Sequence, residues 1–236
     1  MSQRIGVLGG TFDPIHRGHV DLGEAAHSAL GLSTLKVVPL NTPPHRRAPV
    51  ASGFHRFAMV ALAVAGRSRW QASDLELMHA EPSYTAATLR RFHAQGFGPG
   101  DLFFVLGADA FLEIRSWKDY PSILDAAQFA VVSRPGFPVA ELRQKFPDLA
   151  ERMTTAANHR ARTSGASIIL IDARTSDVSS TVIRQRCAED RPLAGLVPDA
   201  VQQHIEQHGL YRSLIQDSRA HRHTQDTPAG RLHGQS

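Results

Sequence analysis

The regular alternation of apolar runs with helix-like segments constrains the fold of this chain more than any other sequence feature. Runs such as RIGVLGG, LKVVPL and DLFFVLG are typical of short buried strands, and a segment with helical character follows most of them. Strands that are apolar throughout are typical of a parallel sheet covered on both faces. We therefore predict an α/β protein with a doubly wound parallel sheet, helices on both faces and a small C-terminal helical portion.

The loops that follow the predicted strands indicate where the functional site lies. In open parallel sheets, ligands bind outside the carboxyl ends of the strands. Five loops rich in glycine, proline, hydroxyl or basic side chains occupy such positions, so we expect them to meet at one edge of the sheet. They are residues 9–16, 41–47, 107–109, 133–136 and 173–180.

Composition predicts how the chain is organised. We expect residues 1–212 of the 236 to form one domain and residues 213–236, which offer few side chains that can pack, to form a disordered tail. Residues 154–166 are polar and are expected to form a mobile surface loop. The apolar runs are too short for a signal peptide or a membrane span.

Charge and cysteine content narrow the functional classes. The net charge of +4 suits anionic, phosphorylated substrates, and it would also suit weak nucleic-acid binding. No block of five or more like charges is present, so we expect neither nucleic acid nor a membrane as partner. The single cysteine, Cys187, cannot form an internal disulfide, which favours a cytoplasmic location.

The segment GGTFDPIHRGH holds the strongest candidate for chemistry. Gly9 and Gly10 leave backbone N–H groups open to a phosphate, and a helix is predicted to begin just after them. His16 and His19, three residues apart, share one face of its first turn and can both donate to phosphate oxygens. The competing interpretation is that His19 caps the helix and His16 packs in the turn. Zinc is less attractive, because no third ligand stands at a supporting spacing.

This segment resembles the HxGH signature of nucleotidyltransferases, which class I aminoacyl-tRNA synthetases share more loosely. VSSTVIRQR resembles the ISSTxIR element of the same superfamily, and no KMSKS-type lysine loop is present. PSYTAATL, GADAFLEIRSWKDYPSIL and LVPDAVQQHIEQHGLY are similar to one family, the bacterial nicotinate-nucleotide adenylyltransferases. The similarity runs from about Arg4 to Tyr211, with the motifs in the family's order.

The resemblance implies a Rossmann-like fold and a nucleotidyltransferase activity. Members of this family transfer AMP from ATP to nicotinate mononucleotide, giving deamido-NAD and pyrophosphate, by direct in-line attack without a covalent intermediate. ATP and nicotinate mononucleotide would be the small-molecule partners. Mg²⁺ would be carried by ATP, so no protein metal ligands are expected. A homodimer is left open.

The same resemblance assigns residues to the two substrates. His16 and His19 would be the catalytic residues. The positions implied for ATP are Gly9, Gly10, Thr11, Phe12, His16, His19, Gly107, Asp109, Arg134, Ser179, Ser180, Thr181 and Arg184. Those implied for nicotinate mononucleotide are Thr11, His45, Arg46, Tyr84, Thr85 and Trp117, with the Thr85 backbone N–H on the ring carboxylate and Trp117 stacked on the pyridine.

Each assignment has an ordinary structural alternative. Asp109 could cap a helix, Arg134 could be a surface arginine, and Trp117 could be a core tryptophan. The serines of the 179–181 segment could form a plain N-cap beside a solvated Arg184.

The sequence also departs from the family pattern. Arg46 stands where a lysine is common and offers a planar fork in place of a point charge. His204 stands where the family often has tyrosine, and we expect it at the surface. Glu81, where glycine is common, is expected to face solvent.

Two rival functions remain at this point. Another adenylyltransferase or cytidylyltransferase of the superfamily would use pantetheine phosphate or a phosphoalcohol. A non-catalytic nucleotide or RNA-binding module would bind RNA in a salt-sensitive way without releasing pyrophosphate. The sequence leaves open the preference for acid over amide, and whether residues 41–52 close over ATP.

Overall fold

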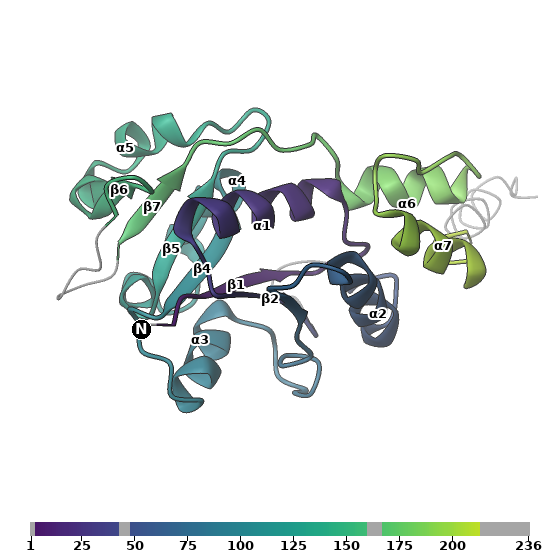
Figure 1. Ribbon diagram of the computed structural model, residues 1–236, viewed down its shortest axis with the longest axis horizontal. Helices are drawn as coiled ribbons and strands as arrows, with labels where there is room; N and C mark the ends of the chain where they lie inside the picture. Colours follow the sequence, from purple (N-terminus) through teal and green to yellow (C-terminus); the bar gives the residue numbers. More distant parts are fainter. Residues whose placement is uncertain (1–2, 43–47, 160–166, 213–236) are drawn as a thin grey trace, which may run out of the picture.

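The fold is a single seven-stranded parallel sheet with helices on both faces. A computed structural model describes residues 3–42, 48–159 and 167–212 (Figure 1). The strand order across the sheet is β3-β2-β1-β4-β5-β7-β6, and all pairs are parallel. The strands are β1 (Ile5–Gly10), β2 (Thr34–Pro39), β3 (Trp70–Ala72), β4 (Leu102–Gly107), β5 (Gln128–Val132), β6 (Met153–Thr155) and β7 (Ile168–Ile171).

Helices connect the strands and extend the chain beyond the sheet. They are α1 (Arg17–Leu30), α2 (Gly53–Val64), α3 (Thr85–Ala94), α4 (Ala108–Phe111), α5 (Leu142–Lys145), α6 (Ser180–Ala188) and α7 (Asp199–Gln207). Figure 1 shows α1 and α3 on opposite sides of the sheet, with α6 and α7 at the end to which β1 points. The predicted fold class, including the C-terminal helical portion, is confirmed.

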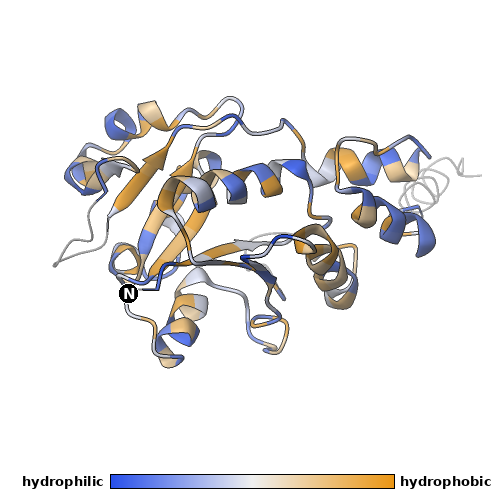
Figure 2. Cartoon of the chain, viewed as in Figure 1, coloured by the Kyte–Doolittle hydropathy of each residue, from blue (hydrophilic) through white to orange (hydrophobic). Residues whose placement is uncertain are grey.

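The strands bury side chains on both faces, which explains their continuous apolar sequences. In β4, Phe103 and Val105 pack under α1 and α2, whereas Phe104 and Leu106 pack with α3 on the other side. Alternate residues of a strand point to opposite faces, so one run serves two cores. Figure 2 shows these central strands as mostly hydrophobic, while the helices show mixed polarity.

The order of the strands fixes where a ligand can bind. From β1 the chain winds outward to β2 and β3, and from β4 it winds the opposite way to β5. β1 and β4 are therefore the point at which the direction reverses, and ligands bind at the carboxyl ends of strands there. Gly10 and Gly107 end these two strands.

Two sequence expectations meet a different outcome or fall outside the described residues. The polar segment 154–166 is not wholly a loop, because Thr154 and Thr155 belong to β6 and pair with β7. Threonine is polar but β-branched, and β-branched residues favour strands. A prediction based on polarity alone therefore missed this edge strand. Residues 160–166 and the tail 213–236 lie outside the described residues. Among the described helices, none has the length and apolar character to cross a bilayer.

The two-layer core predicts very different costs for the same substitution at two positions. Phe92 of α3 is 1% exposed beneath the sheet, whereas Phe54 of α2 is 88% exposed. Phe92→Ala should lower the free energy of unfolding by about 3–5 kcal/mol, because it leaves a cavity. Phe54→Ala should change it by less than about 0.5 kcal/mol. Urea denaturation measures both, and equal effects would contradict the described packing.

Candidate active site

A large cleft lies at the carboxyl ends of β1 and β4. Its volume is about 1400 Å³, which exceeds the roughly 300–1,000 Å³ of a pocket for one drug-sized ligand. Its walls come from the loops after β1, β4 and β7, Arg134 after β5, and the first turn of α3. A cleft of this size suits two nucleotide-sized ligands side by side.

Most of the predicted site residues line this cleft. Those that do are Gly9, Gly10, Thr11, Phe12, His16, His19, Thr85, Gly107, Asp109, Trp117, Arg134, Ser179, Ser180, Thr181 and Arg184. Tyr84 does not line it; its ring lies under the Lys118 ammonium, with Nζ 4.5 Å from the ring centroid. His45 and Arg46 lie outside the described residues.

The two histidines of the HxGH segment lie in direct contact. Their rings are stacked, with centroids 3.7 Å apart and planes inclined by 27°. The backbone N–H of His16 donates to Nδ1 of His19 at 3.3 Å, so the proton of a neutral His19 sits on Nε2. His16 is 3% exposed, and its Nδ1 has no hydrogen-bond partner among the described residues. A buried polar atom without a partner at a cleft is available to a ligand.

Both imidazoles are held neutral. The pKa of His16 is lowered to about 3, by burial first and then by nearby Arg134, while Asp21 opposes the shift. The pKa of His19 is also well below its ordinary value, because of burial first and then of His16 and Arg134. Neutral imidazoles each offer one N–H donor, and an arriving polyphosphate would raise both pKa values by supplying negative charge.

Arg134 reaches the cleft because two neighbouring positions carry no side chain. A Cβ on Gly18 would lie 2.6 Å from Arg134 Nη1, and a Cβ on Gly107 would lie 2.9 Å from its Cγ. Arg134 Nη1 donates to the Gly18 carbonyl at 3.3 Å and lies close to His16. Sequence reasoning assigned no role to Gly18, although it lies within the HxGH segment.

The N-terminus of α6 faces the cleft and also holds the first loop. Ser179 caps the helix by accepting from the Val182 backbone N–H at 3.3 Å. Ser180 Oγ donates to the Pro14 carbonyl at 2.9 Å, and Arg184 Nη1 donates to the Asp13 carbonyl at 2.7 Å. Arg184 is therefore tied to the β1–α1 loop, and the positive end of α6 is fixed beside the histidines.

Asp13 anchors the loop between β1 and α1, a role that sequence reasoning missed. Its side chain is 4% exposed and accepts from the backbone N–H groups of Val50 at 2.7 Å and Ala51 at 3.1 Å. Tyr211 Oη donates to it at 2.8 Å, and burial together with the Asp13 charge raises the pKa of Tyr211. Asp13 thus links three segments that are far apart in the sequence.

Arg56 of α2, which sequence reasoning also missed, holds the backbone that follows β1 and β2. It is 2% exposed and donates to the carbonyls of Thr11 at 2.9 Å and Leu40 at 2.5 Å. Its Nε donates to the Ala51 carbonyl at 3.2 Å. No motif marked Arg56, because its partners are backbone carbonyls of other segments.

The far end of the cleft combines a helix N-terminus with an aromatic wall. Thr85 is the first residue of α3, where backbone N–H groups have no partner within the helix. Trp117 is half-buried and packs edge-on against Phe104, with centroids 5.9 Å apart. Nearby Glu76 is buried, receives a hydrogen bond from Thr88, and has its pKa raised by burial. Sequence reasoning did not identify Glu76.

Asp109 lies in the first turn of α4, exposed at the cleft. Within the described ranges, no group of three metal-ligating side chains occurs in the cleft. One exposed carboxylate suits Mg²⁺ that is held mainly by phosphates and water. The residues present therefore fit a metal ion carried in by a nucleotide.

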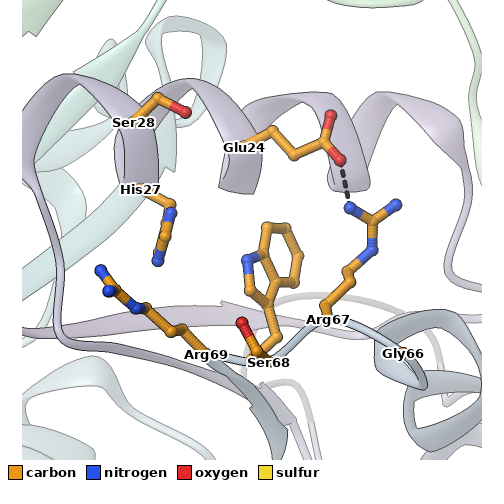
Figure 3. A pocket seen from close by; sticks show the side chains of 8 residues that line it. Glu24, His27, Ser28, Gly66, Arg67, Ser68 and Arg69 are labelled. Atoms are coloured by element: carbon orange, nitrogen blue, oxygen red, sulfur yellow. Dashed lines mark hydrogen bonds and ion pairs between the residues drawn. The ribbon is translucent and has the colours of Figure 1, made fainter.

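A second, smaller hollow lies on a different part of the surface, between α1 and the turn that precedes β3. Its volume is about 430 Å³, and it shares no residue with the large cleft. Figure 3 shows Glu24 and Arg67 paired across it. Glu24 neutralises Arg67 in this hollow, which leaves Arg69 as the remaining guanidinium in its lining, so the hollow offers a polyphosphate fewer donors than the large cleft.

The fold and the large cleft define a nucleotide-binding α/β protein, and residues 7–186 match the cytidylyltransferase-like family. Proteins named "Probable nicotinate-nucleotide adenylyltransferase" are similar over nearly their whole length. The one from Desulfatibacillum aliphaticivorans is 37% identical, covering 88% of this chain and 99% of its own. The one from Roseiflexus sp. (strain RS-1) is 40% identical, covering 89% and 99%. The chain belongs to the nicotinate-nucleotide adenylyltransferases of the cytidylyltransferase-like family, and it is an enzyme.

Solved structures show the same fold at low sequence identity. Nicotinic acid mononucleotide adenylyltransferase from Plasmodium falciparum, complexed with NaAD, has a TM-score of 0.68 at 18% identity. It covers 89% of this chain and 97% of its own. The same enzyme complexed with APC has a TM-score of 0.66 at 18% identity, with the same coverage.

The low pKa of His16 predicts how stability depends on pH. The folded protein binds the His16 proton only below pH about 3, whereas the unfolded chain binds it below its ordinary value of 6.5. The free energy of unfolding therefore falls as the pH falls through this window, by about 1.4 kcal/mol per pH unit for one proton. His16→Asn should remove that contribution and make the dependence between about pH 6 and about pH 4 shallower. Urea denaturation without substrates measures it, and an unchanged slope would contradict the assignment.

Proposed function

We propose that this chain transfers AMP from ATP to nicotinate mononucleotide, giving deamido-NAD and pyrophosphate. One observation carries the proposal. The stacked, neutral pair His16 and His19 lines the same cleft as the N-terminus of α6 and the N-terminus of α3. Each end is suited to an anion, and the two histidines lie where two phosphate-bearing substrates would meet.

ATP is placed at the end that the β1–α1 loop and α6 form. Gly9 and Gly10 expose backbone N–H groups, with Thr11 and Phe12 beside them. The N-terminus of α6 supplies Ser179, Ser180 and Thr181 for the phosphates. Arg134 and Arg184 line the same wall, and Gly107 leaves room where β4 ends.

Nicotinate mononucleotide is placed at the α3 end. The backbone N–H of Thr85 donates to the ring carboxylate, and the positive end of α3 favours an acid over an amide. Trp117 stacks on the pyridine ring. Offset stacking is one of the two arrangements that aromatic rings prefer. Thr11, His45 and Arg46 are assigned to the phosphate of this nucleotide. Tyr84 precedes Thr85 but does not line the cleft, so it makes no direct contact with the ring in this proposal.

The chemical step is a single displacement. An oxygen of the acceptor's 5′-phosphate attacks the α-phosphorus of ATP, a new P–O bond forms, and the bond to pyrophosphate breaks in line with it. The nucleophile is already an anion, so no base is required. His16 and His19 donate hydrogen bonds to the α-phosphoryl oxygens, whose charge must be stabilised as the bonds change.

Mg²⁺ bound to ATP neutralises phosphate charge, and Asp109 is the residue that holds its water shell or a ribose hydroxyl. Residues 1–212 act as one domain, since Tyr211 near the C-terminal end of that range holds Asp13 of the first loop. The single cysteine supports a reducing compartment, the cytoplasm, for this reaction.

The proposed acceptor is tested by comparing the acid with its amide. The purified protein is incubated with Mg²⁺ and ATP, and pyrophosphate release is followed with nicotinate mononucleotide and, in parallel, with nicotinamide mononucleotide. Faster release with the acid, together with deamido-NAD as the product, is expected. Equal rates, or release only with another phosphorylated acceptor such as pantetheine phosphate, would contradict the α3 end of the proposal.

The histidine roles predict a loss of turnover without a loss of structure. His16→Ala and His19→Ala should each lower kcat by at least about 10²–10³-fold, because one donor to the transition state is removed. His27→Ala, on the same helix but outside the cleft, is the matched control and should retain turnover. Circular dichroism checks the fold. Near-normal kcat in either cleft variant would refute its role.

A further inference from the structure

Three histidines from two helices meet away from the active-site cleft. His55 lies in the first turn of α2, and His204 lies on α7. His208 caps the C-terminus of α7, and its backbone N–H bonds to the His204 carbonyl at 3.2 Å, so the two are one helical turn apart on one face. His204, expected at the surface, is partly exposed, and its ring also contacts His55 of α2.

The ring nitrogens are close enough for one metal ion. One nitrogen from each of the three rings lies within 4.8 Å of the others, and His55 Nδ1 is 3.1 Å from His204 Nε2. Zinc–imidazole bonds of about 2.0–2.1 Å in a tetrahedral site place ligand nitrogens about 3.3–3.4 Å apart. Zinc binding therefore requires side-chain rotations that shorten any nitrogen separation close to the 4.8 Å limit.

We propose that His55, His204 and His208 form a zinc-binding site that fastens α7 to α2. Two histidines at i and i+4 on one helix face, with a third from a neighbouring element, are a ligand set that zinc accepts. His208 is exposed, so the fourth position opens to solvent. The site is separate from the proposed function and does not depend on it.

Because α2 and α7 pack against each other beside the three histidines, a metal ion bound there would stabilise the contact between these two helices. Val201 and Ile205 of α7 are buried in the same core as Met59 of α2, so the helices already touch. A metal ion across them restrains α7, which leads directly to Tyr211 and its hydrogen bond to Asp13. Zinc therefore stabilises the C-terminal segment that holds the β1–α1 loop.

Arg56, next to His55 on α2, connects the proposed zinc site to the active-site cleft. Arg56 follows His55 and donates to the Thr11 carbonyl in the wall of the cleft. A metal ion that fixes His55 thus also restrains the start of α2 from which Arg56 reaches that loop. The simpler alternative is a hydrogen bond between His55 and His204 without metal affinity, and it predicts no zinc binding.

The test uses the full chain, without an affinity tag, after removal of metal by chelation. Zinc is added and measured by calorimetry, and Co²⁺ is used as a spectroscopic probe of the ligand geometry. The expected result is one zinc per chain and a higher melting temperature. Slower amide hydrogen exchange in α7 should accompany binding.

Matched variants decide where the zinc binds. His208→Gln and the double variant His204→Gln/His208→Gln should abolish the melting-temperature shift and the Co²⁺ spectrum, while zinc-free turnover is unchanged. His79→Gln, an exposed histidine elsewhere, should bind like the parent chain. His221→Gln/His223→Gln/His233→Gln tests the three histidines of residues 213–236. No stoichiometric binding, or binding that is lost only in the tail variant, would overturn the proposal.

Discussion

The active site depends on the hydrogen bonds to the Asp13 carboxylate, because they hold the loop between β1 and α1 in place. A buried carboxylate is stable only where donors surround it, and here two backbone N–H groups and the Tyr211 hydroxyl do so. These donors come from the segment before α2 and from the end of the described chain. The HxGH segment is therefore held by residues nearly two hundred positions away, and the cleft forms only when the whole domain has folded.

The rest of the site follows from that anchored loop. Because the loop is fixed, His16 and His19 are stacked in a buried position where both stay neutral. Their N–H donors, the N-terminus of α6 and Arg134 are in place before any phosphate arrives. Preorganised donors lose little energy to reorganisation during the reaction, so a direct displacement needs no covalent help from the protein.

The sequence predicted the sheet, its buried strands and the edge where ligands bind, because apolar runs and glycine loops are local signals. It could not predict Asp13, Arg56 and Tyr211 as a group, because their partners come from distant segments that only folding brings together. It missed β6, whose threonines look polar but pair as an edge strand. The His55–His204–His208 cluster was invisible for the same reason: its members lie on helices 149 residues apart in sequence. The described residues to which the family resemblance assigns a role line one shared cleft, with the exception of Tyr84; His45 and Arg46 lie outside the described residues.

The central claim is that this cleft works by positioning two phosphates for one displacement. The stereochemical course at the α-phosphorus tests it most directly. One diastereomer of ATP with sulfur on the α-phosphate is used as substrate with nicotinate mononucleotide, and the configuration of the product is determined. The account predicts inversion, since a single in-line attack reverses the phosphorus centre. Retention would require two displacements through a covalent intermediate and would contradict it.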